Sequence, residues 1–182
     1  METFAAPREF AEHESYSRDR DRVMSALDPA SIDAPIRDVV RGFAQLPHCF
    51  TLQSCFGHFT WDGQSNPRSM DPVPARNVGL VRYQIAYLAL CIERSPAGAR
   101  LRESLAEVET LDAGYVQFGS PGWFWEQYPN SYALQVEPER FQLQDRAAVP
   151  HDEALHVQSV RNRFFVSLRE ILAAAQPGGG AG

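Results

Sequence analysis

Apolar side chains recur at helical spacing in four parts of the chain. Residues 8–27 set sparse apolar anchors among alternating charges, a pattern typical of a surface helix whose charge run is its solvated side. Asp33, with a proline two residues later, has the composition of a helix start, so a second helix is expected over about residues 34–46. A third is predicted over residues 95–110, and a fourth begins after Pro150 with an apolar stripe that faces the core.

Between these helices, the residues favour β-strands. Residues 49–53 and 57–61 are rich in aromatic and β-branched side chains, and the glycine at position 57 predicts a bend between them. Residues 80–92 fit both helical and alternating spacing, and the alternation favours a strand. Residues 115–118 and 131–136 complete the set of expected strands.

Helix followed by strands occurs twice along the chain, which predicts an α+β fold. We expect a largely antiparallel sheet packed with helices, arranged as two similar halves within one domain spanning residues 1–176. Residues 177–182 are glycine-rich and read as a flexible tail. Residues 62–77 hold three prolines and few large apolar side chains, so they predict a long loop that is mobile or covers a site.

Composition and charge narrow the environment and the partners. The three cysteines form no disulfide framework, which favours a reducing compartment, and we expect the protein to be cytoplasmic. No export signal and no membrane-spanning run is expected, so no membrane partner is expected either. The formal net charge of −6 disfavours non-specific binding to nucleic acid, because such binding draws on clustered basic residues.

A cluster of cysteine and histidine residues first raises the question of zinc. His48, Cys49, Cys55 and His58 lie within a short stretch. If the intervening residues are extended, the two sulfurs lie roughly 20 Å apart and cannot share one ion. We therefore expect no metal on this set.

A narrower site remains at the bend that follows the first strand. Gly57 permits a positive φ, and an imidazolium at His58 or exposed amides could activate the Cys55 thiol or bind an anion together with Ser54. The alternative is structural: Cys55 is a small buried residue and His58 points to solvent.

Two tryptophans beside a carboxylate form a second candidate site. If this segment is extended, Trp123 and Trp125 share one side, and with Glu126 they could hold a cation, an adenine ring or a sulfonium group. The alternative is that both indoles are buried for their apolar area.

Polar residues inside apolar strands form a third set. Gln117, Gln135 and Glu137 either line a pocket or face water on the open side of an antiparallel sheet. His151 and His156 are interpreted as surface residues. No nucleotide-binding fingerprint and no nucleophile elbow is present, which disfavours the common nucleotide enzymes and hydrolases.

The stretch from Phe10 to Trp61 resembles the N-terminal part of the tRNA wybutosine-synthesizing protein 3 family. The likeness comprises a charged helix, a second helix opened by Ser-Ile-Asp-Ala-Pro-Ile, and a strand that ends in Ser-Cys-x-Gly. Matched position by position, the resemblance identifies five residues that correspond to the family's motif: Asp33, Thr51, Ser54, Cys55 and Gly57. In this chain Gln53 and Phe56 stand where the family has serines, and His58 where it has an arginine.

The resemblance implies an α+β enzyme that uses S-adenosylmethionine to methylate a modified guanine in tRNA. We therefore expect a methyltransferase-like enzyme in which Cys55 and His58 are catalytic, with a small-molecule ligand and with tRNA disfavoured as partner by the acidic charge. The expected ligand-binding residues are Ser54, Gly57, Trp123, Trp125, Glu126 and Gln135. The alternative is a non-catalytic domain that binds a small ligand or a partner through its tryptophan-lined face.

Overall fold

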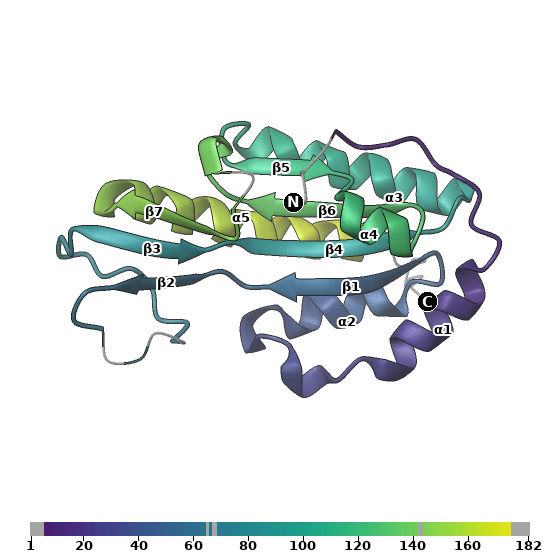
Figure 1. Ribbon diagram of the computed structural model, residues 1–182, viewed down its shortest axis with the longest axis horizontal. Coiled ribbons are helices and arrows are strands. Elements are labelled where there is room, and N and C mark those ends of the chain that lie inside the picture. Colours follow the sequence, from purple (N-terminus) through teal and green to yellow (C-terminus); the bar gives the residue numbers. More distant parts are fainter. Residues whose placement is uncertain (1–5, 65, 67–68, 142–143, 176–182) are drawn as a thin grey trace, which may run out of the picture.

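The computed structural model describes residues 6–64, 66, 69–141 and 144–175. Within these ranges the chain forms two antiparallel sheets, of four and three strands, packed with helices (Figure 1). The predicted α+β class is confirmed. The expected recurrence of two similar halves stays a prediction, and the expected tail at 177–182 lies outside the described residues.

The helices and strands have the following bounds. The α-helices are α1 (Tyr16–Ala26), α2 (Arg37–Gln45), α3 (Pro96–Glu107), α4 (Gly122–Gln127) and α5 (His151–Ala175), with 3₁₀ turns at Pro29–Ser31, Ala34–Ile36, Val108–Leu111 and Glu139–Phe141. The strands are β1 (Cys49–Cys55), β2 (His58–Trp61), β3 (Leu80–Gln84), β4 (Ala86–Ile92), β5 (Val116–Gly119), β6 (Ser131–Val136) and β7 (Arg146–Pro150).

The two sheets are joined by one long hairpin. The larger sheet has the order β1-β4-β6-β5 and the smaller one β2-β3-β7. Cys55 pairs with Tyr87 in the first sheet and His58 with Gln84 in the second, a step of three residues on each strand, so the register continues from sheet to sheet. Figure 1 shows β2 as the extension of β1, and β3 as the extension of β4.

Helix α5 gives both sheets a common core. It packs against β3 and β7 of the smaller sheet, β6 of the larger one, and helices α2 and α3 (Figure 1). The predicted apolar stripe of this helix is confirmed, because Val157, Val160, Phe164 and Leu168 are fully buried. Such burial of large apolar side chains stabilises each by roughly 1.5–3 kcal/mol relative to exposure.

Several expected boundaries are corrected. The first helix begins at Tyr16 rather than near residue 8, because residues 6–13 run along the protein without helical hydrogen bonds. The ambiguous segment 80–92 is extended as expected, but Ile85 divides it into two strands. Residues 122–127 form helix α4, in which the amide of Trp125 donates to the carbonyl of Pro121.

The long segment after β2 is partly fastened to α5. In the described part of residues 62–77 there is no helix or strand, as predicted. Val73 is buried, its amide donates to the side-chain oxygen of Gln158, and the carbonyl of Pro74 contacts the ring of His151. Among the described residues, no helix combines the length and the apolar content needed to cross a membrane.

Gly57 allows a direct test of the sheet-to-sheet bend. Its φ is +89°, and an added Cβ would lie 2.9 Å from Cβ of Ala86 and 3.1 Å from the ring of Tyr83. Gly63 has φ +87°, and nothing lies within 4 Å of a Cβ added there. A substitution at Gly63 therefore measures the cost of backbone strain without a steric clash. We expect Gly63→Ala to lower the free energy of unfolding by about 1–2 kcal/mol, and Gly57→Ala to lower it clearly further. Urea denaturation measures both, and equal losses would contradict a tightly packed bend.

Candidate functional site

The bend between β1 and β2 is held by side chains from distant parts of the chain. The amide of Phe56 donates to Oδ2 of Asp33 at 2.8 Å, and the guanidinium of Arg161 donates to the carbonyl of Gly57 at 2.9 Å. Inside the bend, the amide of Gly57 lies 3.4 Å from Sγ of Cys55. The turn is therefore fixed from the start of α2 on one side and from α5 on the other.

These bonds bring a carboxylate, a thiol and an imidazole together. Oδ2 of Asp33 lies 3.3 Å from Nε2 of His58, and one ligand atom from each of Asp33, Cys55 and His58 lies within 4.8 Å of the others. In the part of the chain that the structure describes, this is the one group of three such residues compact enough to hold a metal ion. The sequence predicts that Cys55 and His58 are neighbours, whereas the local pattern around Asp33 predicts a helix cap.

Asp33 does not cap its helix. It precedes the 3₁₀ turn at Ala34–Ile36, and its side chain makes no capping hydrogen bond there. Its carboxylate instead binds the bend, which is why a residue typical of helix starts becomes part of a site.

The Asp33–His58 pair carries opposite charges at neutral pH. Hydrogen bonding to His58 holds the pKa of Asp33 below its usual range. Hydrogen bonding to Asp33 and then to Cys55 raises the pKa of His58 to about 10. Protonated His58 is therefore a source of positive charge rather than a general base, and its Nδ1 is buried without a hydrogen-bond partner among the described residues.

Arg161 adds a buried cation beneath the bend. Its guanidinium lies 4.0 Å from the centre of the Phe56 ring and 5.0 Å from that of Phe59, and burial lowers its pKa to about 10. No carboxylate in the described ranges forms an ion pair with it. Burying a charged guanidinium without a carboxylate partner costs free energy. The carbonyl of Gly57, the side-chain oxygen of Asn162 and the two aromatic rings offset part of this cost, and the bond to Gly57 fixes the bend.

A pocket of about 210 Å³ lies next to this group. Ile32 and Ser54 line it and adjoin Asp33 and Cys55 in sequence, whereas Asp33, Cys55 and His58 are not among its lining residues. The full lining is Leu27, Ser31, Ile32, Val40, Thr51, Leu52, Gln53, Ser54 and Tyr87.

The polar lining of the pocket arises from an irregularity in β1. The register between β1 and β4 shifts between Thr51 and Gln53, a β-bulge that re-aims the side chains on this edge strand. Oγ1 of Thr51 is buried and has no hydrogen-bond partner among the described residues. Nearby, the hydroxyl of Tyr87 donates to Oε1 of Gln53 at 3.3 Å. A ligand group that bonded Thr51 would satisfy an otherwise unmatched buried hydroxyl.

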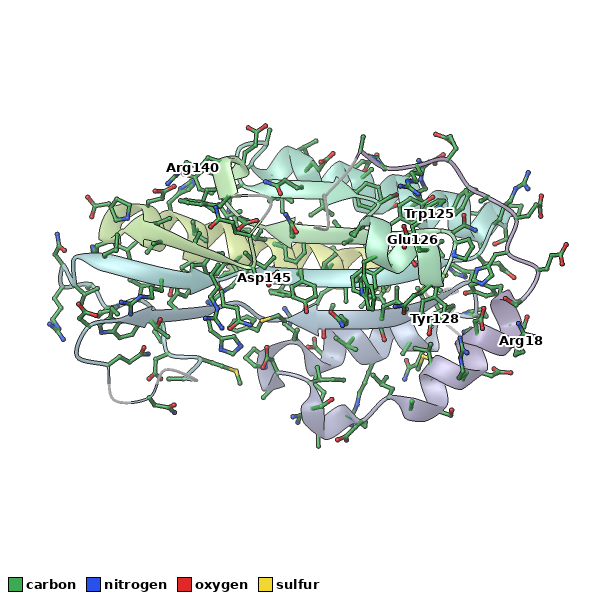
Figure 2. The ribbon with its side chains drawn as sticks, in the orientation of Figure 1. Arg18, Trp125, Glu126, Tyr128, Arg140 and Asp145 are labelled. Carbon is green, nitrogen blue, oxygen red and sulfur yellow. The ribbon has the colours of Figure 1, made fainter. Side chains whose placement is uncertain are left out.

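The tryptophan segment is not part of this pocket. Helix α4 packs on β6, and β4 separates β6 from the strand that carries the pocket. The expectation that Trp123 and Trp125 share one side is wrong, because they are two residues apart on a helix. Trp125 packs edge-on against Tyr132, whereas Trp123 is 53% exposed. Figure 2 shows Trp125 and Glu126 on α4, away from the bend.

The polar strand residues are buried rather than solvent-facing. Nε2 of Gln135 lies 2.6 Å from Oε1 of Gln117 and 3.4 Å from Oε2 of Glu137, and Gln117 donates to the carbonyl of Glu137. Burial raises the pKa of Glu137 to about 8. Gln135 is the cross-strand partner of Tyr87, which lines the pocket, but Gln135 itself does not line it.

The two cysteines outside the bend are buried, and their thiols donate to backbone carbonyls. Cys49 donates to the carbonyl of Phe43, and burial raises its pKa to about 12. A second series of side-chain contacts links Cys91, His13 and Asp19. Burial raises the pKa of Cys91, and its thiol donates to the carbonyl of Pro129.

One histidine expectation is corrected. His151, expected at the surface, is only 5% exposed because its ring lies against Pro74. His156 is partly exposed and pairs with Asp112.

Comparison with known proteins supports the fold. No model of a known protein family matches the chain, and no curated protein matches it. The structure is similar to that of the PH1069 protein from Pyrococcus horikoshii, with a TM-score of 0.53, 10% identity, and coverage of 91% of this chain and 98% of that one. A second structure of PH1069, from strain OT3, gives a TM-score of 0.52, 10% identity, and coverage of 90% and 96%.

A hypothetical protein from Aeropyrum pernix is similar at a TM-score of 0.42, with 11% identity and coverage of 77% of this chain and 97% of that one. At such identities the PH1069 likeness extends to the architecture alone.

Asp33→Asn tests the charge state of His58. Without the carboxylate, the pKa of His58 should fall from about 10 toward its ordinary value of 6.5, which NMR titration of the ring in chelator-treated protein measures. The raised pKa of His58 contributes its full stabilisation below pH 6.5, the ordinary value of the unfolded chain, and loses it as pH rises toward 10. The lowered pKa of Asp33 contributes its full stabilisation above pH 3.8. The variant should therefore lose most stability, relative to the wild type, between pH 3.8 and pH 6.5. Asp112→Asn, which removes the partner of His156, is the control. An unchanged His58 pKa would refute the pairing.

Glu137→Gln tests the buried carboxyl. Its pKa is 4.5 as a free group and about 8 in the fold, so between these values the unfolded chain loses a proton that the folded protein keeps. Wild-type stability should therefore fall as pH rises through this window, relative to the variant, by up to about 1.4 kcal/mol per pH unit. Chemical denaturation at pH 4.5 and pH 8 measures the difference. Exposed Glu139→Gln should track the wild type, and a parallel profile for Glu137→Gln would contradict the assignment.

Proposed function

We propose that this protein is a cytoplasmic, S-adenosylmethionine-dependent methyltransferase-like enzyme that binds its methyl donor in the pocket beside β1. One observation carries the proposal. The five positions marked by the resemblance to the wybutosine-synthesizing family gather around one pocket and one bend. Thr51 and Ser54 line the pocket, Cys55 and Gly57 form the bend, and Asp33 holds it.

The chemistry of the pocket supports a polar organic ligand. Hydroxyls, an amide and a phenol alternate with aliphatic side chains, which is the mixture that orients a small molecule within an apolar site. Its volume of about 210 Å³ lies below the roughly 300–1,000 Å³ of sites that enclose a whole ligand. The pocket therefore takes one end of the donor, and the rest extends along the bend.

Charge at the bend matches the charges of this donor. S-adenosylmethionine carries a carboxylate, an ammonium and a sulfonium group. Protonated His58 offers a counter-charge for the carboxylate, and Asp33 offers one for either cation. Methyl transfer from a sulfonium depends chiefly on alignment and exclusion of water, so the fixed bend contributes by positioning rather than by proton transfer.

The acceptor is proposed from the resemblance alone, as a modified purine base. The net charge of −6 disfavours tight, non-specific binding of tRNA, so an RNA acceptor would need local contacts. Arginine stands at all 17 of the Lys and Arg positions, and its planar fork suits such contacts to phosphate.

A second candidate function rests on α4. Trp123 is 53% exposed although it is large and apolar, a property of side chains at binding surfaces. In this alternative the protein is a non-catalytic domain that binds a partner or small ligand there. Donor binding that depends on Trp123 and not on Thr51 would favour it.

Thr51→Val tests the donor pocket without disturbing the fold. Because Oγ1 of Thr51 bonds no described residue, its removal should leave stability nearly unchanged but weaken donor binding about 10-fold, the value of one net hydrogen bond. For the wild type, donor at 100 times its dissociation constant should raise the melting temperature by about 5–10 °C. Thr60→Val on β2, outside the pocket, is the matched control.

Calorimetric titration gives the two dissociation constants, and labelled donor with bulk tRNA tests the acceptor. Equal donor affinity in Thr51→Val and Thr60→Val, or no donor binding to the wild type, would overturn the proposal.

A further inference from the structure

Three side chains at the bend present the donor atoms of a transition-metal site. A carboxylate oxygen from Asp33, a sulfur from Cys55 and a ring nitrogen from His58 lie within 4.8 Å of one another. They come from two separate segments: the loop before α2 supplies Asp33, and the bend after β1 supplies the other two. The convergence is thus a product of the fold rather than of local sequence.

The spacing matches a tetrahedral ion. In such a site with bonds of about 2.1 Å to oxygen and nitrogen, those two atoms lie roughly 3.4 Å apart, and a sulfur bound at about 2.3 Å lies roughly 3.6 Å from each. The distance from Oδ2 of Asp33 to Nε2 of His58 is 3.3 Å. The sulfur of Cys55 lies within 4.8 Å of a carboxylate oxygen of Asp33 and of a ring nitrogen of His58, so a shift on the order of 1 Å brings it to this spacing.

The donor atoms are already oriented by the backbone. The amide of Phe56 donates to the same carboxylate oxygen of Asp33, and the amide of Gly57 points at the sulfur of Cys55. Partners of this kind hold metal ligands in place and are worth 10- to 100-fold in metal affinity. A substitution that loosened the bend would therefore weaken the site without touching a ligand.

The chemistry of the set selects the metal. Thiolate and imidazole favour zinc over magnesium or calcium, which take oxygen ligands almost exclusively. Three protein ligands are also the number that leaves a fourth position open to water or substrate. Ser54, adjacent to Cys55 in sequence, lines the pocket.

A second set of the same three residue types lacks the convergence on one point that is found at the bend. Cys91, His13 and Asp19 also form a cysteine–histidine–aspartate series. There the sulfur lies 3.8 Å from Nδ1 of His13 while Nε2 binds Asp19, so the ring separates the other two groups. One ion cannot bind all three, and the series serves as an internal control.

We propose that Asp33, Cys55 and His58 form a Zn²⁺ site with an open fourth coordination position beside the β1 pocket. Binding releases into solvent the protons that the imidazole and the thiol carry. Zinc ligation uses the same Asp33 and His58 groups that the proposed function pairs with the charges of the methyl donor, so metal and donor are alternative occupants of these side chains. The metal alone tests the site. Its failure is therefore distinct from failure of the proposed function.

Calorimetric titration of Zn²⁺ into the chelator-treated full chain should give one ion per chain. Asp33→Asn, Cys55→Ser and His58→Gln should each weaken binding by about 100-fold or more, beyond the range expected for an outer partner. Cys91→Ala and His156→Gln remove a cysteine and a histidine elsewhere and should leave the affinity within about twofold of wild type.

Cobalt substitution keeps the test decisive if a variant fails to fold. In the wild type, Co²⁺ should produce the near-ultraviolet charge-transfer band of a cobalt–thiolate bond together with visible bands of tetrahedral intensity, and Zn²⁺ should abolish both. Absence of zinc binding to the wild type, an octahedral cobalt spectrum without the thiolate band, or equal loss of affinity in the two control variants would overturn the site.

Discussion

The bond between the carboxylate of Asp33 and the amide of Phe56 is the interaction on which the architecture of the site depends. At Phe56 and Gly57 the chain leaves one sheet and enters the other, and a strand that bends at this point exposes backbone groups that need partners. Asp33 supplies an acceptor from the loop before α2, and Arg161 supplies a donor from α5. With both in place, the register of the long hairpin continues through the bend, and the two sheets share a core.

The hydrogen bond that fixes the bend also brings the charged side chains of the site together. The oxygen of Asp33 that binds the backbone is the one that meets His58, so the same carboxylate serves structure and charge. Its pairing with His58 places a half-buried positive charge close to the thiol of Cys55, at the end of the edge strand that carries the pocket. Thr51 lines that pocket, and its buried hydroxyl has no hydrogen-bond partner among the described residues.

Local sequence predicts those features that depend on local rules. The α+β class, the buried stripe of α5 and the bend at Gly57 follow from periodicity and from the conformational freedom of glycine. From local sequence alone, Asp33 is expected to cap a helix, because no neighbouring residue shows that its carboxylate binds the amide of Phe56; only the family resemblance marks this position. Arg161 follows a buried valine on an amphipathic helix, where polar residues normally face solvent, so its burial could not be seen. The sequence places the tryptophans of α4 on one side only if the segment is extended, and alternating spacing does not distinguish a short helix from an extended segment.

The most direct test is backbone amide NMR of the protein titrated with S-adenosylmethionine. If the pocket and the bend form the binding site, the largest chemical-shift changes should fall at residues 51–58, with a second group at residues 31–33, and α4 should be little affected. Changes confined to residues 122–127, or none at saturating donor, would contradict it.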